Sequence, residues 1–366
     1  MDAFAISQEE FWLDSTSYLM KMGRSQSLIT VPSASVVFET SGTTGKPRNI
    51  VLSKKGLLHS AFHVNQHLEV NPSSVWGLCL PTWHVGGFAV PSRCYVAACR
   101  LAVYDGRWDA GRAVCWLERE AVTHVSLVPT QIFDIVRGKL RAPESLRAVV
   151  VGGGQLAKCV GQEARDLGWP VLASYGMTEA GSQIATQRLY EIREAYRTYR
   201  LSILPCWEVR TNAESLLEIR GDALFLGELV QEITGESVFR PRESEWFATS
   251  DRVEIDCHEL TILGRADALV KVLGELVSPQ QITQTLTSLG MISGTFAVIA
   301  LPDARKENRL VLVQDADQCH NVGPIIEAYH QSVPGYQRID QVRVVHDMPR
   351  SALGKILLNE LRDRIS

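Results

Sequence analysis

The order of apolar and polar residues predicts alternating strands and helices over the first two thirds of the chain. Short apolar runs bounded by turn residues predict β-strands. These runs lie at Val36–Glu39, Val75–Leu80, His124–Val128, Ala148–Val151 and Val171–Ser174. Stretches with helical spacing of apolar residues separate them, at Lys54–Val70, Trp108–Glu120 and Ala157–Leu167. This alternation predicts a layered α/β domain whose sheet is largely parallel.

The pattern changes twice towards the C-terminus. Trp207–Leu263 has short strands and few helices, which predicts a smaller β-rich lobe. Its strands are expected at Leu216–Ile219, Arg252–Ile255 and Glu259–Leu263. Beyond Arg265, strands are expected at Leu269–Val272, Thr295–Leu301 and Arg309–Val313, and helices at Pro279–Leu289 and Gly323–Gln331. We predict the α/β class: a large layered α/β domain with its β-rich lobe in residues 1–264, and a small mobile α+β domain in residues 265–366.

The composition is typical of a soluble globular enzyme and excludes several other classes. The 366 residues are 45% apolar and 21% charged, and a chain of this length favours two domains. The net charge is −4, and Lys and Arg are dispersed, which argues against a nucleic-acid partner or a membrane-binding basic patch. There is no run of about 18 apolar residues, and the acidic residues in Met1–Met22 are wrong for a signal peptide. We expect a cytoplasmic protein.

Two sets of metal-binding residue types receive a structural interpretation. The eight cysteines, which we expect to be reduced and in core segments, form no CxxC pair, so a zinc or thioredoxin-like centre lacks support. His59, His63 and His67 stand on one face of a predicted helix, where they could bind a metal ion. Structural zinc normally has four protein ligands, and no Cys or acid joins the histidines at useful spacing. We interpret them as incidental to the helix.

A loop of small hydroxyl and glycine residues connects two predicted strands near the N-terminus. Its sequence is Thr40-Ser41-Gly42-Thr43-Thr44-Gly45-Lys46-Pro47-Arg48. Glycines let the backbone approach a phosphate closely, and successive N–H groups and hydroxyls donate to its oxygens. Only two residues separate Gly42 from Gly45, so this is not a Walker A loop. The residues indicate a phosphate-binding loop, and a flexible hairpin loop rich in Thr and Gly is the alternative.

This loop resembles the signature loop of the adenylate-forming superfamily, which includes acyl-CoA and aryl-CoA ligases, luciferases and the adenylation domains of peptide synthetases. The resemblance implies that the loop holds the β- and γ-phosphates of ATP. Arg48 stands where the superfamily usually has lysine, so the charge is kept while the geometry differs. Further segments, in the superfamily's order, extend the resemblance over Val36–Leu361.

The first of these segments is Leu80–Gly87, which resembles a motif whose histidine lies near the acyl pocket. Here that histidine is His84, and the resemblance implies a role in binding and activating the acid. The alternative is a histidine at a helix N-terminus that is satisfied by the local backbone.

The second segment resembles the superfamily's nucleotide motif. Its residues are Ser174-Tyr175-Gly176-Met177-Thr178-Glu179. The resemblance implies that Tyr175 packs near adenine, that Thr178 contacts the α-phosphate and that Glu179 holds Mg²⁺. A carboxylate is the hard oxygen ligand that Mg²⁺ prefers beside phosphates.

Two later segments resemble the ribose motif and the hinge. In Trp246–Asp251, Asp251 would accept hydrogen bonds from both ribose hydroxyls, although Ser250 replaces the usual glycine. In Gly264-Arg265-Ala266-Asp267, Arg265 would meet ribose or phosphate and Asp267 would be the pivot of a domain rotation. For Gly264–Asp267, an ordinary turn is the alternative.

The last two segments belong to the predicted C-terminal domain. Lys271–Pro279 resembles the glycine loop that lines the coenzyme A channel, which implies contacts from Lys271 and Gly274. Pro349–Lys355 resembles the mobile loop that carries the catalytic lysine, which here is Lys355.

The resemblance implies an ATP-dependent acid–CoA ligase. A carboxylate oxygen attacks the α-phosphorus of ATP, pyrophosphate leaves, and an acyl-adenylate forms. Such a step needs positioning and charge neutralisation, for which the resemblance implies Lys355, Thr178 and Mg²⁺ on Glu179. The C-terminal domain then rotates and presents the thiol of coenzyme A, a gating motion.

Within the superfamily, the chain most resembles the o-succinylbenzoate–CoA ligases of menaquinone synthesis. The segments that carry this resemblance are Val125–Gln131, Val151–Gly154 and Gly176–Gln183. This likeness implies nucleotide contacts from Gly153 and Gly154. It implies acid contacts from His84, Ser126, Val128, Pro129, Gly152, Ser182 and Gln183. The alternatives are a ligase for another aryl or acyl acid, delivering to coenzyme A or a carrier protein, and a non-catalytic nucleotide-binding paralogue. Intact Lys355, Glu179 and Asp251 argue against the paralogue.

The segment before the phosphate loop is short. Only 39 residues precede Thr40, fewer than in most members of the superfamily. A lobe that normally packs on the core is expected to be missing or reduced, which leaves apolar surface that a homodimer would cover.

Overall fold

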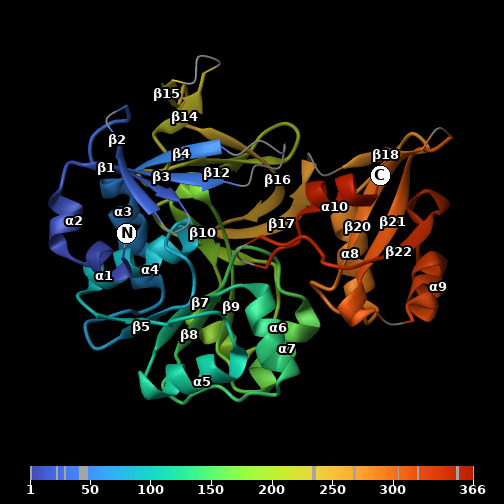
Figure 1. Ribbon diagram of the computed structural model, residues 1–366, viewed down its shortest axis with the longest axis horizontal. Coiled ribbons are helices and arrows are strands. Elements are labelled where there is room, and N and C mark those ends of the chain that lie inside the picture. Colours follow the sequence, from blue (N-terminus) through green and yellow to red (C-terminus); the bar gives the residue numbers. More distant parts are fainter. Residues whose placement is uncertain are drawn as a thin grey trace.

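The computed structural model describes residues 2–21, 24–28, 30–40, 48–232, 236–266, 269–303, 305–319, 321–351 and 354–365. Its largest described sheet has eleven strands in the order β12-β13-β16-β17-β11-β10-β9-β8-β7-β5-β6 (Figure 1). One half of this sheet is parallel and the other half is antiparallel. The predicted α/β class with a β-rich part is confirmed.

The parallel half is built from strands that alternate with helices. Its strands are β5 (Val75–Leu78), β6 (Arg100–Val103), β7 (His124–Leu127), β8 (Ala148–Val151) and β9 (Val171–Met177). The connecting helices are α4 (Val85–Ala97), α5 (Ala110–Arg119), α6 (Pro129–Arg137) and α7 (Lys158–Asp166). Every residue of β7 and β8 is buried, as expected of strands covered on both faces. The carboxyl ends of these strands therefore meet at one edge of the sheet.

The antiparallel half continues from β9. Its strands are β10 (Ser182–Thr186), β11 (Leu201–Ile203), β12 (Glu208–Thr211), β13 (Leu216–Arg220), β16 (Phe247–Asp256) and β17 (Glu259–Arg265). Strand β16 is longer than the predicted Arg252–Ile255, so that prediction was too short. The inward positions of its first half are the polar Thr249 and Asp251, which break the apolar pattern that marks a strand.

A second, six-stranded sheet carries the ends of the predicted phosphate loop. Its order is β15 (Ser237–Pro241), β14 (Gly227–Gln231), β4 (Arg48–Ser53), β3 (Ser35–Thr40), β1 (Ser17–Lys21) and β2 (Arg24–Leu28). Helices α1 (Ala3–Ile6), α2 (Glu9–Leu13) and α3 (Lys54–His67) lie next to it (Figure 1). Strands β3 and β4 pair antiparallel on either side of residues 41–47, which lie outside the described residues.

The N-terminal segment is fixed to this core by aromatic packing and one buried cation. Phe11 and Trp12 of α2 pack edge-to-face against Phe88 of α4. The Lys54 ammonium donates to the carbonyl oxygens of Phe11 at 2.6 Å and Asp14 at 2.7 Å and lies 4.2 Å from the Phe11 ring centre. Its residue is 2% exposed, and burial lowers the pKa of Lys54. The segment thus covers the part of the core around Phe88.

We expect Lys54→Met to lower the free energy of unfolding by about 1.5–3 kcal/mol, because two backbone carbonyls lose a charged donor. Urea denaturation measures this change. The matched control is Lys55→Met, which removes the exposed neighbouring lysine and should change the free energy little. Equal losses in the two variants would show that Lys54 does not hold the N-terminal segment.

The C-terminal residues form a three-stranded sheet with its own apolar clusters. The sheet consists of β20 (Phe296–Asp303), β21 (Glu307–Asp315) and β22 (Gln341–Val345), while β18 (Val270–Val272) and β19 (Glu275–Val277) form a separate two-stranded sheet. The helices of this part are α8 (Pro279–Ser288), α9 (Gly323–Ser332) and α10 (Leu358–Ile365). One face of β20 and β21 packs with Leu286 of α8 and Tyr329 of α9, and the other packs with Leu361 of α10. The division at residues 264 and 265 stays a prediction, and Asp267 lies outside the described residues.

The cysteines are less buried than expected. Of the eight, only Cys94 is buried, and the Cys115, Cys159, Cys257 and Cys319 residues are exposed. The prediction of core positions was therefore wrong for these four, because the amphipathic helices and turns that carry them turn those positions outward. No helix in the described part of the chain is long and apolar enough to cross a membrane.

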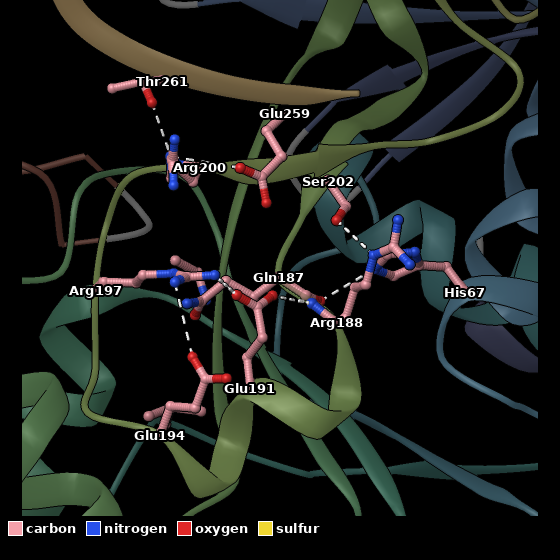
Figure 2. A network of polar contacts seen from close by, with 12 residues as sticks. His67, Gln187, Arg188, Glu191, Glu194, Arg197, Arg200, Ser202, Glu259 and Thr261 are labelled. Carbon is pink, nitrogen blue, oxygen red and sulfur yellow. Dashed lines mark hydrogen bonds and ion pairs between the residues drawn. The ribbon is translucent and has the colours of Figure 1, made fainter. Parts of the chain in front are cut away.

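A network of polar contacts connects the end of α3 to β9 (Figure 2). The His67 Nε2 lies 3.0 Å from the carbonyl oxygen of Gln187, and the Gln187 side chain accepts a hydrogen bond from the backbone N–H of Ala173 at 2.8 Å. Arg197 forms an ion pair with the buried Glu191 on the same connection. The His67 ring is thus engaged by the backbone, and the interpretation of the three histidines as incidental to the helix stays a prediction.

Candidate active site

A pocket of about 240 Å³ opens at the carboxyl ends of β7, β8 and β9, beside the start of α4. In open α/β sheets, ligands bind in the crevice outside the carboxyl ends of the strands. The lining residues are Leu80, His84, Val85, Gly86, Gly87, Arg93, Ser126, Leu127, Val128, Val150, Gly152, Gly153, Ser174, Gly176, Met177, Thr178, Ser182 and Gln183. Predicted acid-contact and nucleotide-contact residues therefore share one pocket.

The start of α4 brings His84 to this pocket. His84 is the N-cap residue, and Gly87 allows the preceding loop to pack closely, since a Cβ at Gly87 would lie 2.1 Å from the Pro81 carbonyl oxygen. Burial lowers the pKa of His84, so the ring is neutral at neutral pH. A neutral imidazole can donate one hydrogen bond and accept another, which suits a bound carboxylate or carbonyl group.

Arg93 is the most unusual residue of the pocket. The residue is 2% exposed, and its guanidinium donates to Ser126 Oγ at 3.3 Å, Ser182 Oγ at 3.2 Å and Gln183 Oε1 at 2.8 Å. It lies 5.0 Å from the Trp76 ring. Burial lowers the pKa of Arg93 to about 10, and within the described ranges it forms no ion pair with a carboxylate. The pocket thus contains a buried cation with only neutral partners.

Sequence reasoning missed Arg93, although it found all three of its hydrogen-bonding partners. A signal was present: Arg93 is the only charged residue of α4, a helix of glycine, proline and mostly apolar residues. An arginine placed alone in such a helix is almost never fully buried unless it is paired, so it points to a functional site.

Backbone geometry is tight where the pocket meets β9. A Cβ at Gly176 would lie 1.8 Å from the carbonyl oxygen of Ser182, so β9 and β10 can approach only with glycine there. Ser182 itself has φ of 139°, a rare value for a residue with a side chain. Strain of this kind persists where the surrounding structure over-determines it and is common at functional sites. In this conformation, the Ser182 hydroxyl accepts a hydrogen bond from Arg93.

A second group of residues lies around Asp251. The Tyr175 hydroxyl donates to Asp251 Oδ2 at 2.6 Å, and Arg265 Nη1 lies 3.8 Å from Asp251 Oδ1. Burial, and then the Asp251 charge, raises the pKa of Tyr175 well above its usual value. Asp251 is 8% exposed on β16. The structure therefore brings together three residues that lie far apart in the sequence and were each predicted to contact the nucleotide.

Lys355 approaches the same group from the C-terminal lobe. Desolvation lowers the pKa of Lys355, and the charge of Arg265 adds to this effect while that of Asp251 opposes it. Its loop is tethered by Arg350, which donates to the carbonyl oxygens of Gly354 at 3.2 Å and Gly294 at 2.8 Å. The lysine is thus held near the predicted ribose site.

Glu179 lies in the short 3₁₀ turn η1 (Thr178–Ala180) after β9. Its carboxylate accepts a hydrogen bond from Arg48 Nη1 at 3.1 Å, and its carbonyl oxygen accepts one from the backbone N–H of Phe225 at 2.8 Å. Among the described residues no cluster of three or more His, Cys, Asp and Glu side chains could hold a metal ion. A cation here would have one or two carboxylates, which is how Mg²⁺ is held beside nucleotide phosphates.

The remaining predicted residues divide into three groups. Ser41, Gly42, Thr43, Thr44, Gly45, Lys46 and Asp267 lie outside the described residues, and Thr40 ends β3 beside them. Pro129 begins α6, and Gly154 follows Gly153 at the edge of the pocket. Lys271 and Gly274 lie in the β18–β19 hairpin, away from the pocket lining; at Gly274, φ is 82°.

The match to a known protein family settles what kind of protein this is. A family model described as AMP-binding enzyme matches residues 28–239, more than half of the chain. The chain belongs to this family. The predictions of an enzyme and of the adenylate-forming superfamily are confirmed, while the roles of individual site residues stay predictions.

Similar proteins extend over most of the chain. The 2-succinylbenzoate–CoA ligase of Bacillus cytotoxicus is 26% identical over 350 residues, which cover 92% of this chain and 71% of that protein. The same-named protein of Bacillus subtilis is 24% identical over 339 residues, covering 88% and 68%.

Solved structures show the same fold. The o-succinylbenzoate CoA synthetase of Bacillus subtilis, in complex with the acyl-adenylate intermediate OSB-AMP, has a TM-score of 0.75 and 23% identity, covering 90% of this chain and 69% of that one. ATP-bound MatB from Rhodopseudomonas palustris has a TM-score of 0.76 and 23% identity, covering 90% and 67%.

Proposed function

We propose that the protein is an ATP-dependent 2-succinylbenzoate–CoA ligase. In the first step a carboxylate oxygen of the acid bonds to the α-phosphorus of ATP and pyrophosphate leaves. In the second step the thiol sulfur of coenzyme A bonds to the acyl carbon and AMP leaves. Curated relatives that carry this name and cover most of the chain support the proposal.

The observation that carries the choice of acid is the buried Arg93 guanidinium. 2-Succinylbenzoate has two carboxylates, and only one of them is activated, so the other keeps its charge. A buried cation is favourable only when it is paired and hydrogen-bonded, and the described partners of Arg93 are all neutral. A substrate carboxylate would supply the missing counter-charge. A pocket for an acid with a single carboxylate would need no such cation.

The residues around Asp251 are proposed to bind the nucleotide. Asp251 has two carboxylate oxygens that can accept hydrogen bonds from the ribose hydroxyls, and Tyr175 fixes its orientation. Lys355, in the same place, can neutralise negative charge that develops as the acid attacks the α-phosphorus. Thr178, which lines the same pocket as Arg93, is proposed to donate to the phosphate.

Glu179 is proposed to hold magnesium. Magnesium beside phosphates is usually bound through one or two protein carboxylates and waters, and Glu179 fits this pattern. When bound, the metal ion would neutralise phosphate charge. The chain supplies the Glu179 carboxylate. The backbone of Glu179 is fixed by the hydrogen bond from the Phe225 N–H to its carbonyl oxygen.

The second step is proposed to need movement of residues 265–366. Among the described residues, Arg137 Nη1 donates to Gln318 Oε1 at 3.4 Å and Gln284 Nε2 donates to Gln155 Oε1, and such exposed contacts can be broken when the C-terminal lobe moves. A rotation about Asp267 would withdraw Lys355 and bring Lys271 and Gly274 towards the pocket, where the thiol of coenzyme A would enter. A homodimer and a cytoplasmic location stay part of the proposal.

ATP–pyrophosphate exchange with a panel of acids tests the function. We expect exchange with 2-succinylbenzoate and little exchange with 4-oxo-4-phenylbutanoate, which lacks the ring carboxylate. Exchange with an acid that has a single carboxylate, and none with 2-succinylbenzoate, would instead support a ligase for another acid. No exchange with any acid, together with ATP binding, would indicate a non-catalytic nucleotide-binding protein.

A further inference from the structure

Arg48 is shared between two acidic residues from different parts of the chain. It donates through Nη1 to Glu179 at 3.1 Å and through Nη2 to Glu228, and it forms an ion pair with each of them. Glu228 lies on β14, 180 positions after Arg48. The side chain of Glu179 is 13% exposed, and those of Arg48 and Glu228 are 37% and 31% exposed. The three form a partly buried cluster with a formal charge of −1.

The sheet fixes the place of Glu228. Strands β4 and β14 pair antiparallel, with Glu228 opposite Ile50, so Glu228 and Arg48 share the face of the sheet that carries the buried Ile50. Gly227 keeps the hairpin tight, because a Cβ there would lie 2.1 Å from the Arg240 carbonyl oxygen. Glu228 therefore reaches Arg48 from a rigid position.

The fork of arginine suits this arrangement. A guanidinium presents N–H donors in fixed directions and can bind two carboxylates at once, whereas an ammonium is a single point charge. Arg48 thus binds Glu228 and the carboxylate proposed to hold magnesium through two different nitrogens of one guanidinium.

We propose that Glu228 is a positioning residue of the metal–nucleotide site, which acts through Arg48 to control the Glu179 carboxylate. Before magnesium arrives, Arg48 neutralises Glu179 and keeps it in place. Glu179 would hold a divalent cation in place of Arg48, and Arg48 would then keep Glu228 as its counter-ion, so that no cation is left unpaired. The proposal rests on the proposed function only in assigning ATP and magnesium to this site.

The expected effect of Glu228→Gln follows from charge. The cluster changes from −1 to 0, and Arg48 is left with Glu179 as its only carboxylate. Magnesium must then displace Arg48 from its sole partner, so the gain in ATP affinity on adding Mg²⁺ should fall about threefold to fivefold, the size expected of a partly exposed ion pair. Metal-free ATP, a polyanion, should bind as well as in the wild type or better.

Calorimetric titration of ATP into the full chain, with EDTA or with MgCl₂, measures this coupling without any turnover. The matched control is Glu232→Gln, the same charge change beside the same hairpin, where Glu232 pairs with Arg240 instead. Arg48→Lys should itself reduce the coupling, and adding Glu228→Gln to it should reduce the coupling little further.

Three outcomes would overturn the proposal. They are an unchanged gain from Mg²⁺ in Glu228→Gln, an equal loss of affinity with and without Mg²⁺, and the same change in Glu232→Gln. Failure of the proposed function would look different: the wild type would bind ATP with its normal dependence on Mg²⁺ and yet activate no acid.

Discussion

Lys355→Ala should lower the rate of acyl-adenylate formation about 10²–10³-fold, because a charge-stabilising donor is removed from the site where phosphate charge develops. The same variant should convert supplied acyl-adenylate and coenzyme A to the thioester at nearly the wild-type rate. Pyrophosphate exchange measures the first step, and thioester formation from supplied acyl-adenylate measures the second. Equal loss in both steps would mean that Lys355 supports the structure of the C-terminal lobe instead.

The titration of Lys355 gives a second measure of the same role. Desolvation lowers the pKa of Lys355, so its ammonium loses the proton at a lower pH than an ordinary lysine does. Adenylation should therefore decline with rising pH before the usual lysine range is reached, while the second step should not share this decline. Lys158→Ala, which removes an exposed lysine at the start of α7, is the control and should leave both steps and their pH profiles unchanged.

The sequence predicted those parts of the site that lie in short continuous motifs. Tyr175, Asp251 and Lys355 each stand in a run whose residue types indicate their chemistry, and the structure brings the three into one place. Buried parallel strands such as Ala148–Val151 were predicted with the observed bounds, since a continuous apolar run needs no long-range information.

What the sequence did not reveal depends on contacts between distant positions. From the sequence alone, Glu228 would be taken for a polar residue of an edge hairpin. In the structure, the pairing of β14 with β4 places Glu228 against Arg48. From the sequence alone, Lys54 would be taken for a solvated first residue of a helix. In the structure, α2 lies over Lys54 and the Phe11 carbonyl oxygen accepts a hydrogen bond from its ammonium. The environment of such side chains depends on tertiary contacts, which override the predictions made from local sequence patterns.

Arg93→Met should separate function from stability. Methionine replaces the long side chain with an apolar one, and such a replacement of a buried ionic group is often neutral or stabilising. We therefore expect a melting temperature equal to or above that of the wild type, even though Ser126, Ser182 and Gln183 lose a donor. For 2-succinylbenzoate, kcat/KM for adenylation should fall about 10²–10³-fold, because truncating one member of a buried charge pair costs about 2–5 kcal/mol.

The pattern across acids decides between a specific and a general role for Arg93. If its guanidinium binds the second carboxylate, the loss should appear mainly in KM, and 4-oxo-4-phenylbutanoate should be used by Arg93→Met at least as well as by the wild type. Arg112→Met, which removes an exposed arginine on α5, should leave both acids unaffected. A loss of the same size for both acids would contradict recognition of a second carboxylate. Because a pocket built around a desolvated cation rejects ligands that leave it unpaired, removal of that cation should relax selectivity as well as reduce affinity.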